Sequence, residues 1–350
     1  MDCVQKKMLQ VYEQVKNICD LHNLRYYAAG GTKIGAVLWQ GIIPWDDDID
    51  LVMPIEDLMC LIDIISKEEN EYLGVFDGLS APYSDIVGVK IFDSRTMFTS
   101  YNLLNRPEAF TGVFVDIFPM IGAPSDINSF TTEINLLRDE LFKKRLFGQS
   151  IEENLALLEQ LKEMMYRYPF DKSEIVLNIA NPVAEAFSRY EFLEAVDMPF
   201  ETTTIPVSRF YDKHLKQQYG FYTKDWPEEK RVHSHEEFAL LDLNRGIEYY
   251  RNAIFSSPIQ NYIFKMGVIK ENLESQIFSI DDSRKKLDQE KRELVSNLEE
   301  ILLEKQKVEV ELSEKNTTLE ALTSSTSWKI TKPLRKLSSL FKQIKVRKEM

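Results

Sequence analysis

Four aspartates stand within five positions in the stretch PWDDDIDLVMP, residues 44–54, and an apolar run follows them at once. In an extended strand successive side chains point to opposite faces, so Asp48 and Asp50 share one face while Ile49 between them points to the other. Two carboxylates on one face repel each other unless a cation lies between them. A fold that contains this strand must bury its apolar face and supply positive charge to its acidic face.

A hard divalent cation meets that need, because carboxylate oxygens are its preferred ligands. Mg²⁺ is the usual ion when phosphates complete the coordination shell, and Mn²⁺ accepts the same oxygens. The pattern is not an EF-hand, since the required glycine and terminal glutamate are missing. Asp116, in VFVDIF, also stands alone in an apolar strand, where a carboxylate without a partner is costly. We therefore expect Asp116 to face the same cation or the same polar pocket.

Two features near these carboxylates suit a phosphate. Gly30-Gly31-Thr32 follows an apolar and aromatic run and predicts a strand that turns into a helix, where bare backbone N–H groups can bind a phosphate. Lys90, in VGVKIFD, offers a positive charge from another strand. Each feature alone is ordinary, because a Gly-Gly pair is most often only a turn and aspartate runs are often solvated loops or Ca²⁺ sites.

The first 257 residues have the pattern of one globular domain. Amphipathic spacing predicts helices, and β-branched and aromatic runs predict strands. The predicted helices cover 2–23, 56–68 and most of about 126–190, and the predicted strands cover 49–54, 87–93 and 112–120. A chain of 350 residues is long enough for such a domain to bury a substantial core.

After about residue 257 the pattern changes to a heptad repeat, with a linker predicted at 258–272 and a coiled coil at 273–322. One set recurs every seven residues at Leu273, Ile280, Leu287, Leu294, Ile301, Val308 and Leu322, with Lys315 as its polar member; the interleaved set is Ile277, Leu298, Leu312 and Leu319, interrupted by Arg284, Lys291 and Lys305. A lone helix this polar has no core to stabilise it, so the repeat favours a homo-oligomer. The alternative is a helix folded back on the preceding domain.

Residues 323–350 form a basic tail. They hold eight Lys or Arg and one Glu, a net charge of +7. Because the whole chain has a net charge of −13, residues 1–322 have a net charge of −20. The interleaved apolar residues are Trp328, Ile330, Leu334, Leu337, Leu340, Phe341 and Ile344. This composition is typical of an amphipathic helix that binds an anionic membrane surface. A disordered, solvated tail is the alternative.

The remaining composition narrows the functional classes. A net charge of −13 argues against a nucleic-acid partner, because affinity for phosphates needs clustered Lys and Arg. The three cysteines have no Cys-x-x-Cys spacing, which excludes a zinc cluster and a full disulfide framework. With no apolar run of membrane-spanning length and no apolar leader at the start, a cytoplasmic location is expected.

The combination of these features is more specific than any one of them. The order of the motifs resembles that of proteins with the nucleotidyltransferase fold, an α+β fold with a mixed sheet flanked by helices. The motifs are a Gly-Gly pair, then Asp-x-Asp on a strand, then one Asp on a later strand. The stretch AAGGTKIGAVLWQGIIPWDDDIDLVMPIEDL resembles the LicD family, which is related to fukutin and the fukutin-related protein. KIFD, VDIFPM and YGFYTKDWPEEKRVHSH are similar to later blocks of that family, in the same order. The resemblance covers about residues 1–240 and implies a catalytic domain over 1–257.

The resemblance implies transfer of a phospho-alcohol, of the phosphocholine or polyol phosphate type, from a CDP-linked donor to a sugar hydroxyl of a glycan. It implies that Asp48 and Asp50 hold Mg²⁺ against the donor pyrophosphate. Asp116 would complete the metal shell or accept the proton of the attacking hydroxyl. The residues implied to touch the phosphates are Gly30, Gly31 and Thr32. Positioning and charge neutralisation supply most of the catalysis in phosphoryl transfer, which agrees with the residues taken alone.

Two positions depart from the family pattern. Leu38 stands where the family usually carries a basic residue, and Lys33 stands where Leu is usual. Lys33 is therefore a candidate to supply positive charge near the donor phosphates. In the later block, Lys230 and Arg231 are candidates for contact with the leaving CMP phosphate, and His233 is a candidate for contact with the substrate.

The tail segment STSWKITKPLRKL resembles one that recurs at the C-termini of bacterial polysaccharide glycosyltransferases. This implies surface-glycan assembly with lipid-linked oligosaccharide acceptors, at the inner face of the cell membrane. Two alternatives stand beside the phosphotransferase: a nucleotidyltransferase that makes a CDP-activated product and releases pyrophosphate, and a non-catalytic scaffold of glycan assembly that acts through its coil. Three costly carboxylates, Asp48, Asp50 and Asp116, argue against the scaffold.

Overall fold

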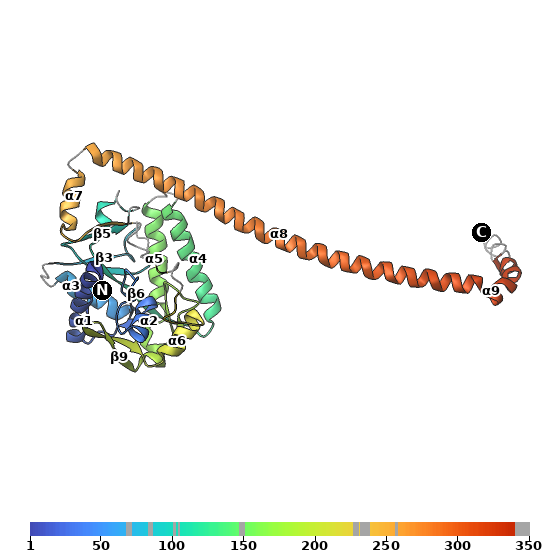
Figure 1. Ribbon diagram of the computed structural model, residues 1–350, viewed down its shortest axis with the longest axis horizontal. Coiled ribbons are helices and arrows are strands. Elements are labelled where there is room, and N and C mark those ends of the chain that lie inside the picture. Colours follow the sequence, from blue (N-terminus) through green and yellow to red (C-terminus); the bar gives the residue numbers. More distant parts are fainter. Residues whose placement is uncertain are drawn as a thin grey trace. The chain divides into compact units, whose positions relative to one another are not determined.

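The structure is a computed structural model that describes residues 1–67, 72–82, 87–100, 103, 106–146, 151–226, 231, 239–255 and 258–339. The chain divides into two compact units, Met1–Gln276 and Ile277–Met350. The first unit combines strands and helices, and the second is helical (Figure 1).

A curled mixed sheet forms the centre of the first unit (Figure 1). Its strands within the described chain are β1 (Tyr27–Ala28), β2 (Asp50–Pro54), β3 (Leu73–Asp77), β4 (Val89–Asp93), β6 (Phe114–Ala123), β7 (Ile175–Asn178) and β8 (Ala186–Ser188). The order is β1-β2-β6-β4-β3, and β7 pairs with β6 and β8. The pair β2·β6 is parallel and the other pairs are antiparallel. The long strand β6 therefore joins every part of the sheet.

The strands predicted at 49–54, 87–93 and 112–120 are confirmed as β2, β4 and β6. Val115 and Ile117 of β6 are completely buried, and they flank Asp116. Strands that are apolar on both faces belong in the interior of a sheet covered by helices. The sequence pattern thus located the strands that carry Asp50, Lys90 and Asp116.

Helices cover this sheet. The helices of the first unit are α1 (Cys3–His22), α2 (Gly30–Leu38), α3 (Ile55–Lys67), α4 (Ile127–Leu146), α5 (Ile151–Arg167), α6 (Tyr211–Tyr219) and α7 (Ile247–Phe255), with 3-10 turns η2 (Pro107–Ala109), η3 (Phe170–Lys172) and η4 (Arg189–Phe192). Helices α1, α3 and α5 pack on β6. A capping box starts α1, because the Asp2 carboxylate accepts from the Gln5 N–H and the Gln5 side chain accepts from the Asp2 N–H.

The region 126–190, predicted as mostly helical, is helical only in its first part. Helices α4 and α5 occupy it as far as Arg167, but β7 and β8 then return to the central sheet. The run Ile175-Val176-Leu177 is β-branched or apolar and pairs with the end of β6, which favours a strand over a helix. Two antiparallel pairs complete the unit: β9 (Ala195–Phe200) with β10 (Thr203–Ser208), and β5 (Met97–Ser100) with β11 (Ala239–Asp242).

One helix, α8 (Pro258–Ser324), contains the whole predicted coiled-coil segment. It also runs through 258–272, so the linker predicted there is helical. A long C-terminal helix is thus confirmed, and its pairing with another helix stays a prediction. A short helix, α9 (Thr326–Ile330), begins where the Ser325 hydroxyl accepts from the Trp328 N–H at 3.2 Å, and residues 332–339 are also helical. No helix in the described part of the chain has the length and apolar content needed to cross a membrane.

Candidate functional site

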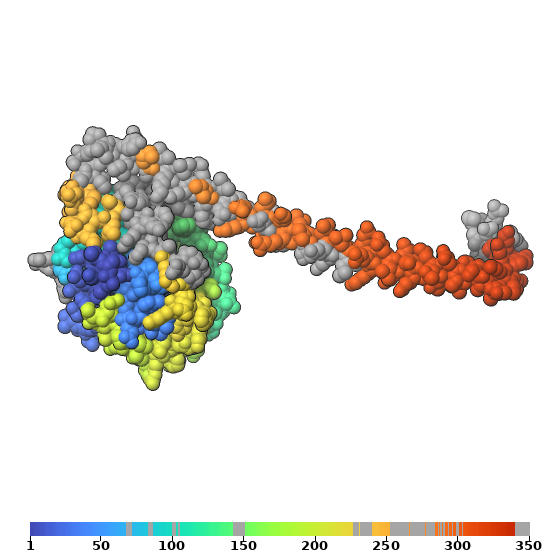
Figure 2. Space-filling model, in the orientation of Figure 1, coloured from blue at the N-terminus to red at the C-terminus, as the bar shows by residue number. Residues whose placement is uncertain are grey.

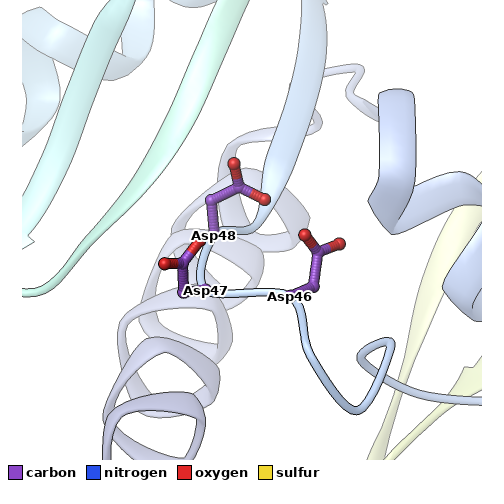
Figure 3. Close-up of side chains that lie close together, drawn as sticks. All are labelled: Asp46, Asp47 and Asp48. Carbon is purple, nitrogen blue, oxygen red and sulfur yellow. The ribbon is translucent and has the colours of Figure 1, made fainter. Parts of the chain in front are cut away.

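Asp46, Asp47 and Asp48 lie in the loop that leads into β2, and Asp50 is the first residue of β2. Asp46 and Asp50 lie beside the first turn of α2. Asp46, Asp47 and Asp48 each offer a carboxylate oxygen, and these oxygens lie within 4.8 Å of one another (Figure 3). Asp47 is buried, and the other two are partly exposed. The side-chain amide of Gln5 in α1 donates to the carbonyl oxygen of Asp46 at 2.9 Å, which fixes this loop against the first helix.

A row of three charged side chains crosses the sheet. Asp50 of β2 is in register with Asp116 of β6, and Asp116 is in register with Lys90 of β4. Residues directly opposite each other on neighbouring strands project from the same face. The Lys90 ammonium donates to both carboxylate oxygens of Asp116 at 2.9 Å. The sheet therefore brings Asp50 and Asp116 together, and Lys90 supplies the partner that a buried Asp116 requires. The predicted contact between Lys90 and a phosphate stays a prediction.

Negative charge exceeds positive charge around Asp50. Burial raises the pKa of its carboxyl well above the ordinary value of 3.8, and the carboxylates of Asp48, Asp116 and Asp46 raise it further. The charge of Lys90 acts in the opposite direction and lowers this pKa. The side chains therefore favour an additional cation beside Asp50, because such a charge would let the carboxylates ionise together.

Gly30 and Gly31 allow two of these carboxylates to approach α2 closely. Gly30 has a φ of +46°, and a Cβ there would lie 2.8 Å from a carboxylate oxygen of Asp50. A Cβ at Gly31 would lie 2.7 Å from a carboxylate oxygen of Asp46. The left-handed φ favours glycine at position 30, and a side chain at either position would displace an aspartate carboxylate. The predicted turn from strand to helix is present, and carboxylates lie against its positive end. Its contact with phosphates stays a prediction.

Thr32 connects α2 to the start of β2. The backbone N–H of Asp50 donates to the Thr32 hydroxyl at 2.8 Å, and the N–H of Ala29 donates to the carbonyl of Asp50 at 3.0 Å. Thr32 is buried, so its hydroxyl positions Asp50 from within the fold. The phosphate contact expected of Thr32 is untested by this geometry.

Lys33 and Glu185 are buried groups of opposite charge, and each influences the pKa of the other. Burial lowers the pKa of Lys33 and raises the pKa of Glu185, and each group opposes the shift of the other. The Lys33 ammonium lies 5.9 Å from the centre of the Phe187 ring of β8. The Glu185 carboxylate accepts from the amides of Asn178 at 3.3 Å and Gln218 at 3.0 Å. Glu185, which no sequence pattern marked, therefore connects β7, α6 and the Lys33 side chain.

Tyr219, the last residue of α6, lies near the aspartates, and sequence reasoning did not select it. Burial raises the pKa of its phenol, and the carboxylates of Glu185, Asp50, Asp46 and Asp48 raise it further. The Tyr219 side chain is therefore within electrostatic reach of both Glu185 and the acidic loop. One signal was present in the sequence, since Tyr219 is the first residue of the block YGFYTKDWPEEKRVHSH.

The predicted contacts with CMP lie in that block. Lys230 and His233 fall outside the described residues. Arg231 is exposed, and its guanidinium lies 5.0 Å from the centre of the Trp45 ring. Trp45 packs edge to face against Trp39, with ring centres 5.7 Å apart. Arg231 thus lies beside the residue that directly precedes the aspartates.

The site fits a hard divalent cation. Its candidate ligands are carboxylate oxygens, and the charge around Asp50 is unbalanced. Among the described residues, the carboxylates grouped closely enough to share one ion are those of Asp46, Asp47 and Asp48. The predicted set was Asp48, Asp50 and Asp116, so the two sets share Asp48. Asp46 therefore joins the candidates, together with Asp47.

Comparison with known proteins agrees with this geometry. Residues 23–147 match the family described as LicD/FKTN/FKRP, nucleotidyltransferase domain. The matched segment contains the Gly30-Gly31 turn, the acidic loop, Lys90 and Asp116. Residues 23–147 of the chain therefore match a LicD-family domain. The LicD-family match thus includes the acidic row on the sheet and ends before the long helix α8.

Similarity to one individual protein extends over more residues than the matched segment. The chain is 26% identical over 257 residues to "Lipopolysaccharide cholinephosphotransferase LicD" of Haemophilus influenzae, which covers 67% of this chain and 95% of that protein. An uncharacterized protein of Rickettsia prowazekii is 40% identical over 67 residues, 18% of this chain and 25% of that protein. An uncharacterized protein of Rickettsia typhi is 43% identical over 56 residues, 15% of this chain and 18% of that protein.

Proposed function

We propose that this protein is an Mg²⁺-dependent transferase of the LicD type. It transfers a phospho-alcohol, of the phosphocholine or polyol phosphate type, from a CDP-linked donor to a sugar hydroxyl of a bacterial cell-surface polysaccharide. The observation that carries the proposal is the unbalanced group of carboxylates at Asp50, placed against the Gly30-Gly31 turn in a LicD-family domain. The cholinephosphotransferase from Haemophilus influenzae, which aligns with 67% of the chain, supports the reaction type.

Asp48 and Asp50 hold the cation in this proposal, and Asp46 lies close enough to join them. When bound, the cation neutralises charge on the donor pyrophosphate. The chain itself supplies the positioning. Thr32 fixes the backbone of Asp50, and Gln5 fixes the loop at Asp46. Both contacts come from helices, so the carboxylates are held on a rigid frame.

Transfer forms a bond between the acceptor oxygen and the phosphorus of the alcohol phosphate, and it breaks the bond from that phosphorus to CMP. The acceptor hydroxyl loses a proton in this step. Asp116 either takes this proton or completes the metal shell, since it lies in register beside Asp50. The Lys90 ammonium donates hydrogen bonds to both carboxylate oxygens of Asp116 and so fixes the orientation of that carboxylate.

Product analysis with the purified full chain tests this function. CDP-choline, CDP-glycerol and CDP-ribitol are each supplied with Mg²⁺ and a lipid-linked oligosaccharide acceptor. We expect release of CMP and a gain of one phosphodiester on the glycan by mass spectrometry, with loss of both in EDTA. Release of pyrophosphate from CTP would instead indicate a nucleotidyltransferase. Unchanged turnover in EDTA would overturn the role of the metal.

Two substitutions divide the possible roles of Asp116. If Asp116 takes the proton, Asp116→Asn loses turnover but binds Mn²⁺, measured by calorimetry, as tightly as the unchanged protein. If Asp116 is a ligand, Mn²⁺ affinity falls together with turnover. Asp63→Asn is the matched control, because Asp63 is an exposed aspartate on α3 that pairs with Lys67.

We also propose that the protein works at the inner face of the cell membrane and binds it through the tail. In the described part of the tail, Trp328, Ile330, Leu334 and Leu337 are exposed large apolar side chains interleaved with Lys and Arg. Such a segment binds anionic lipid by apolar insertion and by charge. The full chain should float with vesicles of phosphatidylglycerol and not with phosphatidylcholine vesicles. Equal flotation after removal of residues 326–350 would contradict this.

A further inference from the structure

The helix α8 leaves a continuous apolar seam exposed. Ile277, Leu287, Leu294, Leu298, Ile301, Val308, Leu312, Leu319 and Leu322 are each 54 to 68% exposed. In Figure 2 the coloured atoms of this segment lie on the surface of the second unit. Monomeric proteins rarely expose contiguous apolar surface over such a length. A helix of this kind requires a partner.

The spacing of the seam defines its heptad positions. Intervals of three residues from a to d and four from d to a place Ile277 at a and Ile280 at d. The d positions from 287 to 308 are all apolar: Leu287, Leu294, Ile301 and Val308. The a positions are mixed: Ile277, Arg284, Lys291, Leu298, Lys305, Leu312 and Leu319. One side of the seam is therefore apolar, and the other alternates between apolar residues and cations.

The positions that flank the seam carry the opposite charge. Between 277 and 322 the charged residues at e and g are all acidic: Asp281, Asp288, Glu290, Glu304, Glu309 and Glu311. No Lys or Arg stands at an e or g position in this range. The cations at a and the acids at e and g are thus complementary, and they lie on the same face of one helix.

We infer that α8 pairs with α8 of a second copy of this chain as a parallel, two-stranded coiled coil in register. In that arrangement each a residue packs against the same residue of the other chain, beside the g residue that precedes it. Each Arg or Lys at an a position therefore lies beside the same residue of the other chain, and each apolar a residue packs against its own copy. Lys291 and Lys305 then lie beside Glu290 and Glu304 of the other helix, whereas Arg284 lies beside Ser283. The aliphatic stem of each cation covers the seam while its charged end stays in water.

Lys305 illustrates the charge balance. Its ammonium lies 3.8 Å from the Glu309 carboxylate on its own helix. In the parallel pair, Glu304 of one chain faces Glu309 of the other, which alone is repulsive. Lys305 stands between these two acids on both chains and offsets that repulsion. The cation at position a therefore supports this register.

An antiparallel pair loses these matches. There, a residues face d residues, so Arg284, Lys291 and Lys305 would lie against Leu, Ile or Val. The flanks would pair g with g and e with e, which places acid opposite acid along the helix. A shift by one heptad would place cationic layers against apolar ones. Charge thus selects the parallel, in-register pair.

The mass of the full chain in solution is the first test. Multi-angle light scattering should give twice the chain mass at micromolar concentration. Leu294→Lys combined with Ile301→Lys should weaken dimerisation at least about 100-fold, because both place charge at d. Val310→Lys is the matched control, since Val310 is equally exposed but lies at f, away from the seam. A monomer or a trimer for the unchanged chain, or equal loss in the control, would overturn the inference.

Cysteine cross-linking tests the orientation. Leu287→Cys and Leu322→Cys lie at d, five heptads apart, and are made in a chain with Cys3→Ser and Cys60→Ser to remove the exposed thiols. A parallel pair in register brings each new cysteine against its own copy, so both variants should form covalent dimers on mild oxidation. Thr317→Cys, at f, should not. Cross-linking at only one of 287 and 322 would show an antiparallel pair and overturn the proposed orientation.

Discussion

In the first unit a lysine and an aspartate, Lys90 and Asp116, are buried among apolar strands, whereas in α8 leucines and isoleucines are exposed and the charges lie around them. The difference reflects what each segment can reach within one chain. The sheet gives a buried charge an opposite charge on the neighbouring strand. The helix has no neighbouring segment in the described part of the second unit to cover its seam. The exposed seam thus indicates a partner, and the buried charges indicate a site.

The largest expected effect concerns the buried side of this comparison. Asp50→Asn should lower turnover by at least about 10³-fold, because several kcal/mol of charge stabilisation depend on the cation. The same change should raise the melting temperature of the metal-free protein, since the raised pKa of Asp50 means that its carboxylate is disfavoured in the fold at neutral pH. Activity assays and thermal melts in EDTA measure both. A variant that is both inactive and less stable in EDTA would contradict the charge crowding inferred here.

The second prediction compares a buried ion pair with an exposed one. Lys90→Met should lower the free energy of unfolding by about 3–4 kcal/mol, because it removes the buried cation that is hydrogen-bonded to both carboxylate oxygens of Asp116. Lys67→Met removes an exposed pair with Asp63 and should change stability by less than about 0.5 kcal/mol. Urea titrations give both values. Adding Asp116→Asn to Lys90→Met should recover most of the loss, and failure to do so would remove the charge explanation.

The third prediction concerns the effect of pH on the stability of the first unit. His214 is the only fully buried histidine among the described residues, and residues 277–350 contain no histidine. Burial, together with the charge of Lys33, lowers the pKa of His214 to about 4, although the hydrogen-bonded carboxylate of Glu191 opposes this shift. Between pH 6.5 and 4 the unfolded chain therefore binds the proton first. Stability should fall as pH decreases through this window, by roughly 3 kcal/mol.

His214→Gln is the control for this pH effect. Its amide can still donate to Glu191 but does not titrate. Urea titrations at pH 7, 5.5 and 4.5 should show a smaller slope for the variant than for the unchanged chain. Equal slopes would assign the acid sensitivity to other groups.

The smallest effect concerns the seam. Lys305→Leu should stabilise the dimer of α8 by about 1 kcal/mol, because it replaces a cation at an a position with an apolar residue. The same change should weaken the preference for two helices over a larger number. Sedimentation equilibrium should show tighter association with some higher oligomer. Weaker association after this change would mean that Lys305 does not lie at a core position.

Local patterns located several parts of the fold. Runs with the spacing of a strand predicted β2, β4 and β6, and the heptad repeat predicted the helical segment within α8. These patterns depend only on residues that are close together in the sequence. The run of aspartates was found for the same reason, but Asp48 was expected on the strand with Asp50, and it lies in the loop before β2, which begins at Asp50. The strands β7 and β8 were mistaken for helix, since a short apolar run favours either structure until it finds a partner strand.

The site itself was only partly visible in the sequence. The sequence indicated that Asp50 and Asp116 share a pocket, but their register, and the engagement of Lys90 with Asp116, depend on the pairing of three strands distant in the chain. Tyr219 and Glu185 approach the site from α6 and from the β7–β8 connection. No pattern of nearby residues in the sequence indicates that these two side chains lie close to the site.

By itself the sequence determined where charge and apolar residues are concentrated: an acidic loop before a buried strand, an apolar seam with acidic flanks, and a basic tail. Spacing along the chain carries that information because helices and strands have fixed periods. Only the tertiary structure decided which charges meet. Burial changes the cost of a charge according to its neighbours in space, and those neighbours come from strand register and helix packing, which no short stretch of residues specifies.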